Sequence, residues 1–214
     1  MGYIEIHGFT KIIKKKLILD EINLSLEKGK IYGLYGRNGS GKTMLLRAIA
    51  GLIRPTSGSI VIDGNILHKD ISFPESVGVI IENVSLLPQF DAFTNLKNLS
   101  KIKKVATDDD INVALTKVGL NNNPKKVHTY SLGMRQKLAI AQAIFENPKI
   151  LLLDEPTNGL DEISVQNIKQ VLLAEKEKGT VIVLASHNIE DLRYLSDEII
   201  YMSAGKVDVH DSSS

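Results

Sequence analysis

A glycine-rich segment of eight residues constrains the fold of this 214-residue chain more than any other feature. It joins a predicted strand, 31–35, to a predicted helix, 42–52, and consists of Gly36, Arg37, Asn38, Gly39, Ser40, Gly41, Lys42 and Thr43. Such glycines let backbone N–H groups converge on phosphate oxygens where the helix begins, and the helix dipole also favours anions there. Lys42 is expected to reach the β- and γ-phosphates of a nucleotide, and Thr43 to ligate Mg²⁺. The segment predicts a nucleoside-triphosphate site on an α/β fold.

A second candidate site follows a run of four aliphatic residues, 150–153, which predicts a buried strand. Asp154 and Glu155 come directly after it, at the end of the strand where open α/β sheets bind ligands. Asp154 is expected to hold Mg²⁺ through water, and Glu155 to polarise the water that attacks the γ-phosphate. Adjacent acids also occur in plain exposed turns, so it is their combination with the phosphate loop that favours a catalytic role.

Hydrophobic patterning predicts the remaining elements. Apolar runs without polar alternation indicate strands that are buried on both faces of a parallel sheet. Further strands are expected at 4–6, 22–26, 59–62, 77–81, 181–185 and 199–202. A helical stretch is expected from 94 to 147, with Asp108, Asp109 and Asp110 as the N-cap and first turn of one helix, and further helices at 162–178 and near 189.

A third segment, 130–136, resembles the signature sequence of the ABC (ATP-binding cassette) ATPases, and the resemblance covers almost the whole chain. It implies a P-loop ATPase core of the RecA type with a mainly parallel sheet, an N-terminal antiparallel β part and a helical insertion. The insertion would span about 83–147, between core segments of about 1–82 and 148–214. We therefore expect a single domain of this fold.

The same resemblance implies roles for residues outside the phosphate loop. Ser131 and Gly133 would bind the γ-phosphate of ATP held by a second, facing subunit, because they open a helix whose N-terminus attracts anions. On its own this loop would also fit a plain capping turn. The segment 156–161 resembles the D-loop, which lies across the dimer interface. His187, just after the predicted strand 181–185, resembles the switch histidine, which can donate to the γ-phosphate and orient the attacking water.

Three positions depart from the family pattern. Where the family usually has a metal-ligating glutamine, this chain has Glu82. A glutamate here resembles the subgroup that exports bacteriocins, lantibiotics and other peptide antibiotics, and its carboxylate can still ligate Mg²⁺. Where the family stacks an aromatic ring on the adenine, this chain has Ile13, so we expect aliphatic contact and modest discrimination between ATP and GTP. Leu132 stands where the signature prefers glycine, which changes the flexibility of that loop.

The composition argues against several other classes of function. The formal net charge of +1 gives no general attraction to nucleic acid or anionic lipid, and there is no cysteine for disulfides, thiol catalysis or zinc. No apolar run approaches the roughly 18 residues of a membrane-spanning helix, and the alternation at 3–7 predicts a strand rather than a signal peptide. A membrane-spanning part would belong to another polypeptide.

Together these features predict the ATP-binding and ATP-hydrolysing subunit of an ABC transporter. Two cassettes, identical or related, would close around two ATP–Mg²⁺ and energise export through a separate transmembrane permease, at the cytoplasmic face of the cell membrane. A soluble ABC ATPase acting on nucleic acid or ribosomes is an alternative, although the chain shows neither a coiled-coil or zinc insertion nor a second cassette, so no nucleic-acid partner is expected. A complex that transmits force or senses antibiotics without transport is another.

Overall fold

The computed structural model describes residues 2–82, 84–121 and 123–208. The predicted boundary at 83 and the last residues of the predicted core segment, 209–214, therefore lie outside the described part. Within it, six strands form a sheet in the order β10-β9-β3-β8-β7-β6, which is parallel except for the β10–β9 pair. These strands are β3 (Ile31–Tyr35), β6 (Val77–Ile80), β7 (Ile150–Asp154), β8 (Val181–Ser186), β9 (Glu198–Ser203) and β10 (Lys206–Asp208).

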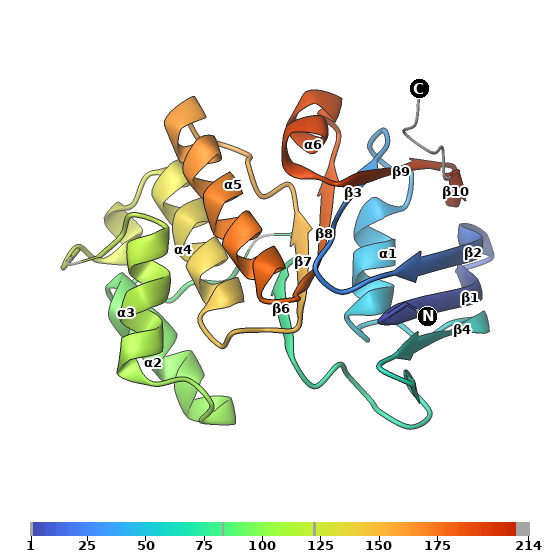
Figure 1. The fold of residues 1–214 in the computed structure, drawn as a ribbon, viewed down its shortest axis with the longest axis horizontal. Coiled ribbons are helices and arrows are strands. Elements are labelled where there is room, and N and C mark those ends of the chain that lie inside the picture. The colour runs from blue at the N-terminus through green and yellow to red at the C-terminus, as the bar shows by residue number, and fades with distance from the viewer. Residues whose placement is uncertain (1, 83, 122, 209–214) are drawn as a thin grey trace.

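A second sheet of four described strands is antiparallel throughout, in the order β2-β1-β4-β5. Its strands are β1 (Ile4–Ile13), β2 (Lys16–Leu26), β4 (Ser57–Ile62) and β5 (Asn65–Ile66). The helices are α1 (Lys42–Ile49), α2 (Ala92–Lys103), α3 (Asp108–Lys117), α4 (Leu132–Ile144), α5 (Glu162–Glu177) and α6 (Ile189–Leu195), with a 3₁₀ turn η1 (Val127–Thr129). Figure 1 shows α1 between the two sheets, and α2 to α5 on the other side of the parallel sheet.

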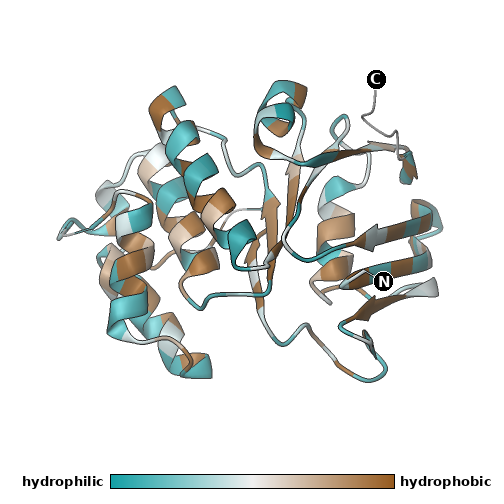
Figure 2. Ribbon diagram, viewed as in Figure 1, coloured by the Kyte–Doolittle hydropathy of each residue, from teal (hydrophilic) through white to brown (hydrophobic). Residues whose placement is uncertain are grey.

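The central strands are apolar because they are covered on both faces. All six residues of β8 are buried, and in β7 only Asp154 is not. Along β7 the side chains alternate: Ile150 and Leu152 pack with α1 and the antiparallel sheet, whereas Leu151 and Leu153 pack with the helices of the other layer. Figure 2 shows these central strands as predominantly hydrophobic. The packed sheet therefore holds in place the polar residues that follow the carboxyl ends of its parallel strands.

The predicted α/β class, mainly parallel sheet and N-terminal antiparallel part are all present, but some element ends differ. The predicted strand 4–6 continues to Ile13, because a two-residue turn pairs β1 with β2 over its whole length. Helix α1 ends at Ile49 rather than at 52, and Gly51 just after it adopts a φ of +77°. The N-cap of α3 is Thr107, not Asp108, and the three aspartates fill its first turn.

Between residues 84 and 147, all regular elements of the described chain are helical, and the strands lie outside this range. Helix α4 crosses β6 so closely that a Cβ at Gly78 would lie 1.9 Å from the carbonyl oxygen of Ala143. The larger of the two hydrophobic clusters runs from α2, α3 and α4 into the parallel sheet. This helical segment shares a hydrophobic core with the sheet. That residues 83–147 form a separate subdomain therefore stays a prediction.

Candidate active site

The glycine-rich segment forms the turn from β3 to α1. A Cβ at Gly36 would lie 2.4 Å from the carbonyl oxygen of Met202, so only glycine fits there. Gly41 is the N-cap of α1 with a φ of 110°, and it provides no side-chain cap. The N–H groups of the first turn of α1 are therefore left for a ligand, at the end of the helix that attracts anions.

A cavity of about 470 Å³ lies over this turn, and the residues 38–44 form much of its wall. Two of its side chains, those of Ser40 and Lys42, are polar and buried, and buried polar groups normally have hydrogen-bond partners. The Ser40 hydroxyl is buried and has no hydrogen-bond partner in the described part of the chain. The Lys42 ammonium is buried and donates to the carbonyl oxygen of Gly36 at 2.6 Å. A buried cation beside an unpaired hydroxyl fits an anionic, oxygen-rich ligand such as a phosphate chain.

Thr43 and Asp154 meet at the edge of this cavity. The Thr43 hydroxyl donates to Asp154 Oδ2 at 2.6 Å, although 111 residues separate them. Burial is the main cause that raises the pKa of the Asp154 carboxyl above its ordinary value of 3.8; the hydrogen bond from Thr43 opposes it. A hydroxyl and a partly desolvated carboxylate are oxygen ligands of the kind that Mg²⁺ prefers, so the two residues fit the predicted metal site.

Glu155 and His187 are also brought together, because β7 and β8 are adjacent parallel strands and both residues follow their carboxyl ends. Glu155 Oε1 accepts hydrogen bonds from His187 Nδ1 at 2.8 Å and from the His187 backbone N–H at 3.1 Å. Its Oε2 accepts from the Ser186 hydroxyl at 3.2 Å. Glu155 also lines the cavity over the glycine-rich turn. The predicted base and the predicted switch histidine thus form one hydrogen-bonded pair beside the candidate phosphate site.

Glu82 follows β6 and has a φ of 61°. Its carboxylate pairs with Arg47 of α1 at 2.8 Å, and its charge contributes to the raised pKa of Asp154. Its predicted role as a metal ligand stays a prediction. Ile13 does not line the cavity; Lys16 and Ile18 of β2 do. The contact of Ile13 with the adenine, and the weak base discrimination it implies, also stay predictions.

Ser131 and Gly133 lie apart from this cavity and are not among its lining residues. Ser131 is the N-cap of α4, where its hydroxyl accepts from the Met134 N–H at 3.2 Å, and no acidic residue occupies the first turn. Leu132 is exposed and packs against Gly159, where a Cβ would lie 2.6 Å from Leu132 Cδ2. The N-terminus of α4 is therefore open to an anion from outside the chain's own cavity.

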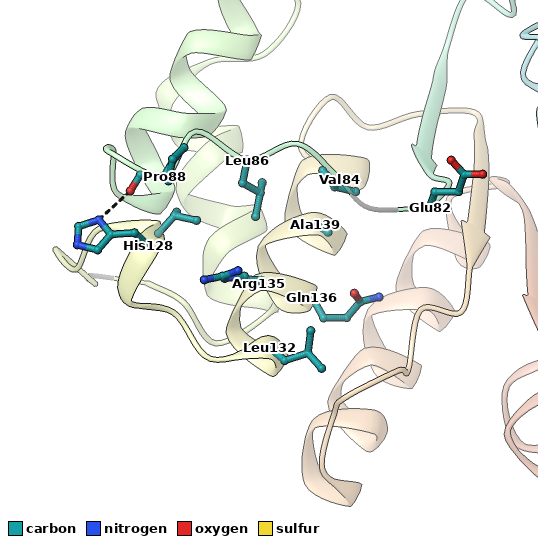
Figure 3. A pocket seen from close by; sticks show the side chains of 10 residues that line it. Glu82, Val84, Leu86, Pro88, His128, Leu132, Arg135, Gln136 and Ala139 are labelled. Atoms are coloured by element: carbon teal, nitrogen blue, oxygen red, sulfur yellow. Dashed lines mark hydrogen bonds between the residues drawn. The ribbon is translucent and has the colours of Figure 1, made fainter.

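Three residues of this region make contacts that the sequence did not predict: Ser186, Arg47 and Gln136, of which Gln136 ends the signature-like segment 130–136. Ser186 and Arg47 contact the predicted site residues Glu155 and Glu82, and Gln136 hydrogen-bonds the backbone at Glu155. Gln136 also lines a second cavity of about 450 Å³, together with Glu82 and the first turns of α4 (Figure 3). No sequence signal marks these contacts, because each depends on how separate elements pack.

Residues 19–158 match the family model described as "ABC transporter". The chain is 59% identical to the ABC transporter ATP-binding protein YybJ of Bacillus subtilis strain 168, over 96% of this chain and 94% of that protein. It is 36% identical to the lantibiotic transport ATP-binding protein SrtF of Streptococcus pyogenes, covering 95% and 88% of the two chains. It is 38% identical to the bacitracin transport ATP-binding protein BcrA of Enterococcus faecalis, covering 94% and 67%.

Among solved structures, the dimeric structure of MJ0796, described as a bacterial ABC transporter cassette, has a TM-score of 0.85 and 27% identity, covering 96% of both chains. Its post-hydrolysis dimer bound to ADP and Pi has a TM-score of 0.84 and 25% identity, again over 96% of both. The helical, parallel and antiparallel parts described above are thus arranged as in these cassettes. In the part of the chain that the structure describes, no helix has the length and apolar character needed to cross a membrane.

Proposed function

The chain belongs to the ABC transporter family as an ATP-binding protein, and we propose that it hydrolyses ATP to energise the export of a peptide antibiotic through a separate transmembrane permease. The family, its ATPase cassette fold and the similarity to lantibiotic and bacitracin transport proteins support the general activity. The assignment of each site residue, the export direction and the peripheral position at the cytoplasmic face of the membrane are parts of the proposal.

One observation carries the catalytic assignment: the contacts Thr43–Asp154 and Glu155–His187 lie together on the edge of the cavity over the glycine-rich turn. The backbone of residues 36–43 and the Lys42 ammonium would hold the phosphates of ATP. Thr43 and Asp154, with Glu82 when it leaves Arg47, would hold Mg²⁺, which supplies charge stabilisation for the phosphates. These residues bind and orient the nucleotide on rigid strand and helix ends.

Glu155 is the general base of this proposal. Its carboxylate would accept a proton from the water that attacks the γ-phosphorus, while the bond to the ADP oxygen breaks. The Ser186 hydroxyl and the His187 ring hold the carboxylate at the cavity edge. His187 could then donate to the γ-phosphate as well as orient the water. The reaction converts ATP and water to ADP and phosphate.

Two cassettes are needed because Ser131 and Gly133 lie away from the chain's own cavity. In a face-to-face dimer, the N-terminus of α4 from one subunit would approach the γ-phosphate bound to the other. The dimeric structures of MJ0796 support a dimer of this kind. ATP would thus join the two subunits, and hydrolysis at Glu155 would let them separate and so drive the attached permease.

The substitution Glu155→Gln tests the catalytic assignment. It keeps the size of the side chain and one acceptor oxygen but removes the base, so the variant should bind ATP, form an ATP-held dimer and show no measurable turnover. Light scattering after size exclusion would detect the dimer, and release of phosphate would measure turnover. Glu162→Gln on the exposed start of α5 is the matched control and should behave as wild type. Normal turnover in Glu155→Gln would remove Glu155 as the base.

The transporter assignment has a separate test. Affinity purification from membranes should recover a partner with about six membrane spans, and vesicles containing both proteins should move a peptide antibiotic in an ATP-dependent manner. Recovery of ribosomal or DNA-bound proteins instead would support the soluble alternative. A membrane partner without any transported substrate would favour the sensing or force-transmitting alternative.

A further inference from the structure

Gln136, on the first turns of α4, reaches the segment that follows the candidate catalytic strand β7. Its side-chain amide donates to the carbonyl oxygen of Pro156 at 3.0 Å and to that of Glu155 at 3.3 Å. Figure 3 shows Arg135 and Gln136 pointing in opposite directions from the helix. Among the described residues, Gln136 is the only side chain of α4 that hydrogen-bonds this segment. The contact links the signature helix to the backbone of the proposed base.

The backbone at Glu155 needs such support. Its φ of 50° lies in the left-handed region, which residues other than glycine rarely adopt because it crowds the Cβ. Surrounding contacts must therefore hold it. The Glu155 N–H donates to the carbonyl oxygen of Ala185 at 2.8 Å, which fixes one side of the peptide. Its own carbonyl oxygen accepts from Gln136 and from the Asn158 N–H, which fixes the other.

An amide is well matched to this position. Two carbonyl oxygens face the side chain, and a primary amide offers two N–H donors, whereas a carboxylate offers none. We propose that Gln136 is a positioning residue for ATP hydrolysis: it holds the left-handed backbone of Glu155 so that the carboxylate meets Ser186 and His187. This inference rests on the proposed role of Glu155 as the base.

The location of Gln136 gives this contact a second consequence. The N-cap of helix α4 is Ser131, which we assign to the ATP held by the facing subunit, while Gln136 contacts the backbone of the proposed base in the chain's own site. Less than two helical turns separate the two residues. If the α4 N-terminus moved on binding the partner's ATP, the Gln136 contact would carry that movement to the peptide of Glu155. In the proposed dimer, the contact would link the two ATP sites through one helix.

The test compares Gln136→Glu with wild type in ATP hydrolysis and in hydrogen exchange. The glutamate keeps the shape of the side chain but turns the donors into acceptors that face two carbonyl oxygens. We expect kcat to fall about tenfold, because about two hydrogen bonds of ordinary strength are lost, while KM for ATP changes less than about twofold. We also expect faster amide exchange in residues 155–160 of the variant, a readout that does not depend on turnover.

Gln142→Glu is the matched control, since it makes the same change on the same helix and Gln142 has no side-chain hydrogen bond in the described part of the chain. It should keep wild-type kcat and exchange. Gln136→Met, which removes the donors without adding charge, should give the same kcat loss as Gln136→Glu and covers the case in which the charged variant does not fold.

Wild-type kcat in either folded Gln136 variant would overturn the inference, as would an equal rise of KM with unchanged kcat. The control Gln142→Glu losing activity to the same extent would also overturn it, because the effect would then belong to the helix as a whole. A wild-type protein without ATPase activity would instead overturn the proposed function itself, so the two failures are distinguishable.

Discussion

Asp154 shows how burial prepares a side chain for a cation. Its carboxyl lies at the end of β7, where desolvation raises its pKa and Thr43 supplies a single compensating hydrogen bond. The charge of Lys42 also favours the ionised carboxylate, but burial outweighs both effects, so a further cation at this place would stabilise the site. The charge of Glu82 is instead balanced by an ion pair with Arg47. Both side chains are partly exposed, Arg47 at 33% and Glu82 at 60%. An exposed pair of this kind contributes under about 1 kcal/mol, so Glu82 is released at little cost.

The pH dependence of stability tests this account of Asp154. Because the folded pKa is raised, the folded state binds the proton more tightly than the unfolded state, and stability is lost as the pH rises from about 3.8 through the folded pKa. Asp154→Asn cannot ionise, so without nucleotide or Mg²⁺ it should melt at a higher temperature than wild type at pH 7. The difference should shrink as the pH approaches 4. Thermal melts followed by circular dichroism at several pH values would measure it.

Asp161→Asn provides the opposite control. Hydrogen bonds from Ser164 lower the pKa of the Asp161 carboxyl below its ordinary value of 3.8. The ionised carboxylate therefore stabilises the folded state above pH 3.8, and this stabilisation is lost as the pH falls through the folded pKa. Asparagine remains a good N-cap, so only the charge changes. This variant should melt slightly lower than wild type at pH 7, and a rise for both variants would contradict the account.

At the scale of elements, capping decides where helices begin. Thr107 and Asp110 form a reciprocal capping box at the start of α3: the Thr107 hydroxyl accepts from the Asp110 N–H at 3.2 Å, and the Asp110 carboxylate accepts from the Thr107 N–H at 2.8 Å. Thr107→Ala removes the first bond and the 2.6 Å hydrogen bond that the hydroxyl donates to the Asp110 carboxylate, and should cost about 1 kcal/mol in the free energy of unfolding. Thr107→Ser keeps the hydroxyl and should stay close to wild type. Urea titration of the three proteins would show an equal loss in both variants if the cap were unimportant.

The same helix shows what the sequence reveals and what it does not. Three aspartates in a row located the start of α3 to within one residue, but which residue donates its side chain as the cap depends on backbone geometry. The glycine-rich turn from β3 to α1 was predictable because its glycines lie within six residues of the chain. The contacts of Glu82 with Arg47 and of Gln136 with Glu155 were not, because they join residues from different elements whose approach is set by packing of the sheet and α4.

At the scale of the whole molecule, a buried carboxylate joins helix α5 to helix α3. Glu175 of α5 is 1% exposed and accepts from Lys117 of α3 at 2.7 Å and from Lys178 at 3.0 Å. Lys178 also donates to Asn147, which in turn donates to Asp110 at the start of α3. The network therefore spans both ends of α3 and the connection into β7. It holds α3 against α5 and so limits how α4, which packs on α3, can move relative to the catalytic strand.

Removal of both lysines should destabilise the protein more than removal of the carboxylate. In the double variant Lys117→Met/Lys178→Met, Glu175 keeps its charge in a buried place without a partner, which costs about 3–5 kcal/mol. In Glu175→Leu, the two lysines are 27% and 44% exposed and can turn to water, so the loss should be smaller. Each single lysine variant should lie between wild type and the double variant, because one partner remains. Urea unfolding of the four variants would measure these losses, and a larger loss for Glu175→Leu than for the double variant would show that packing of the side chain, not its charge pairing, holds α3 against α5.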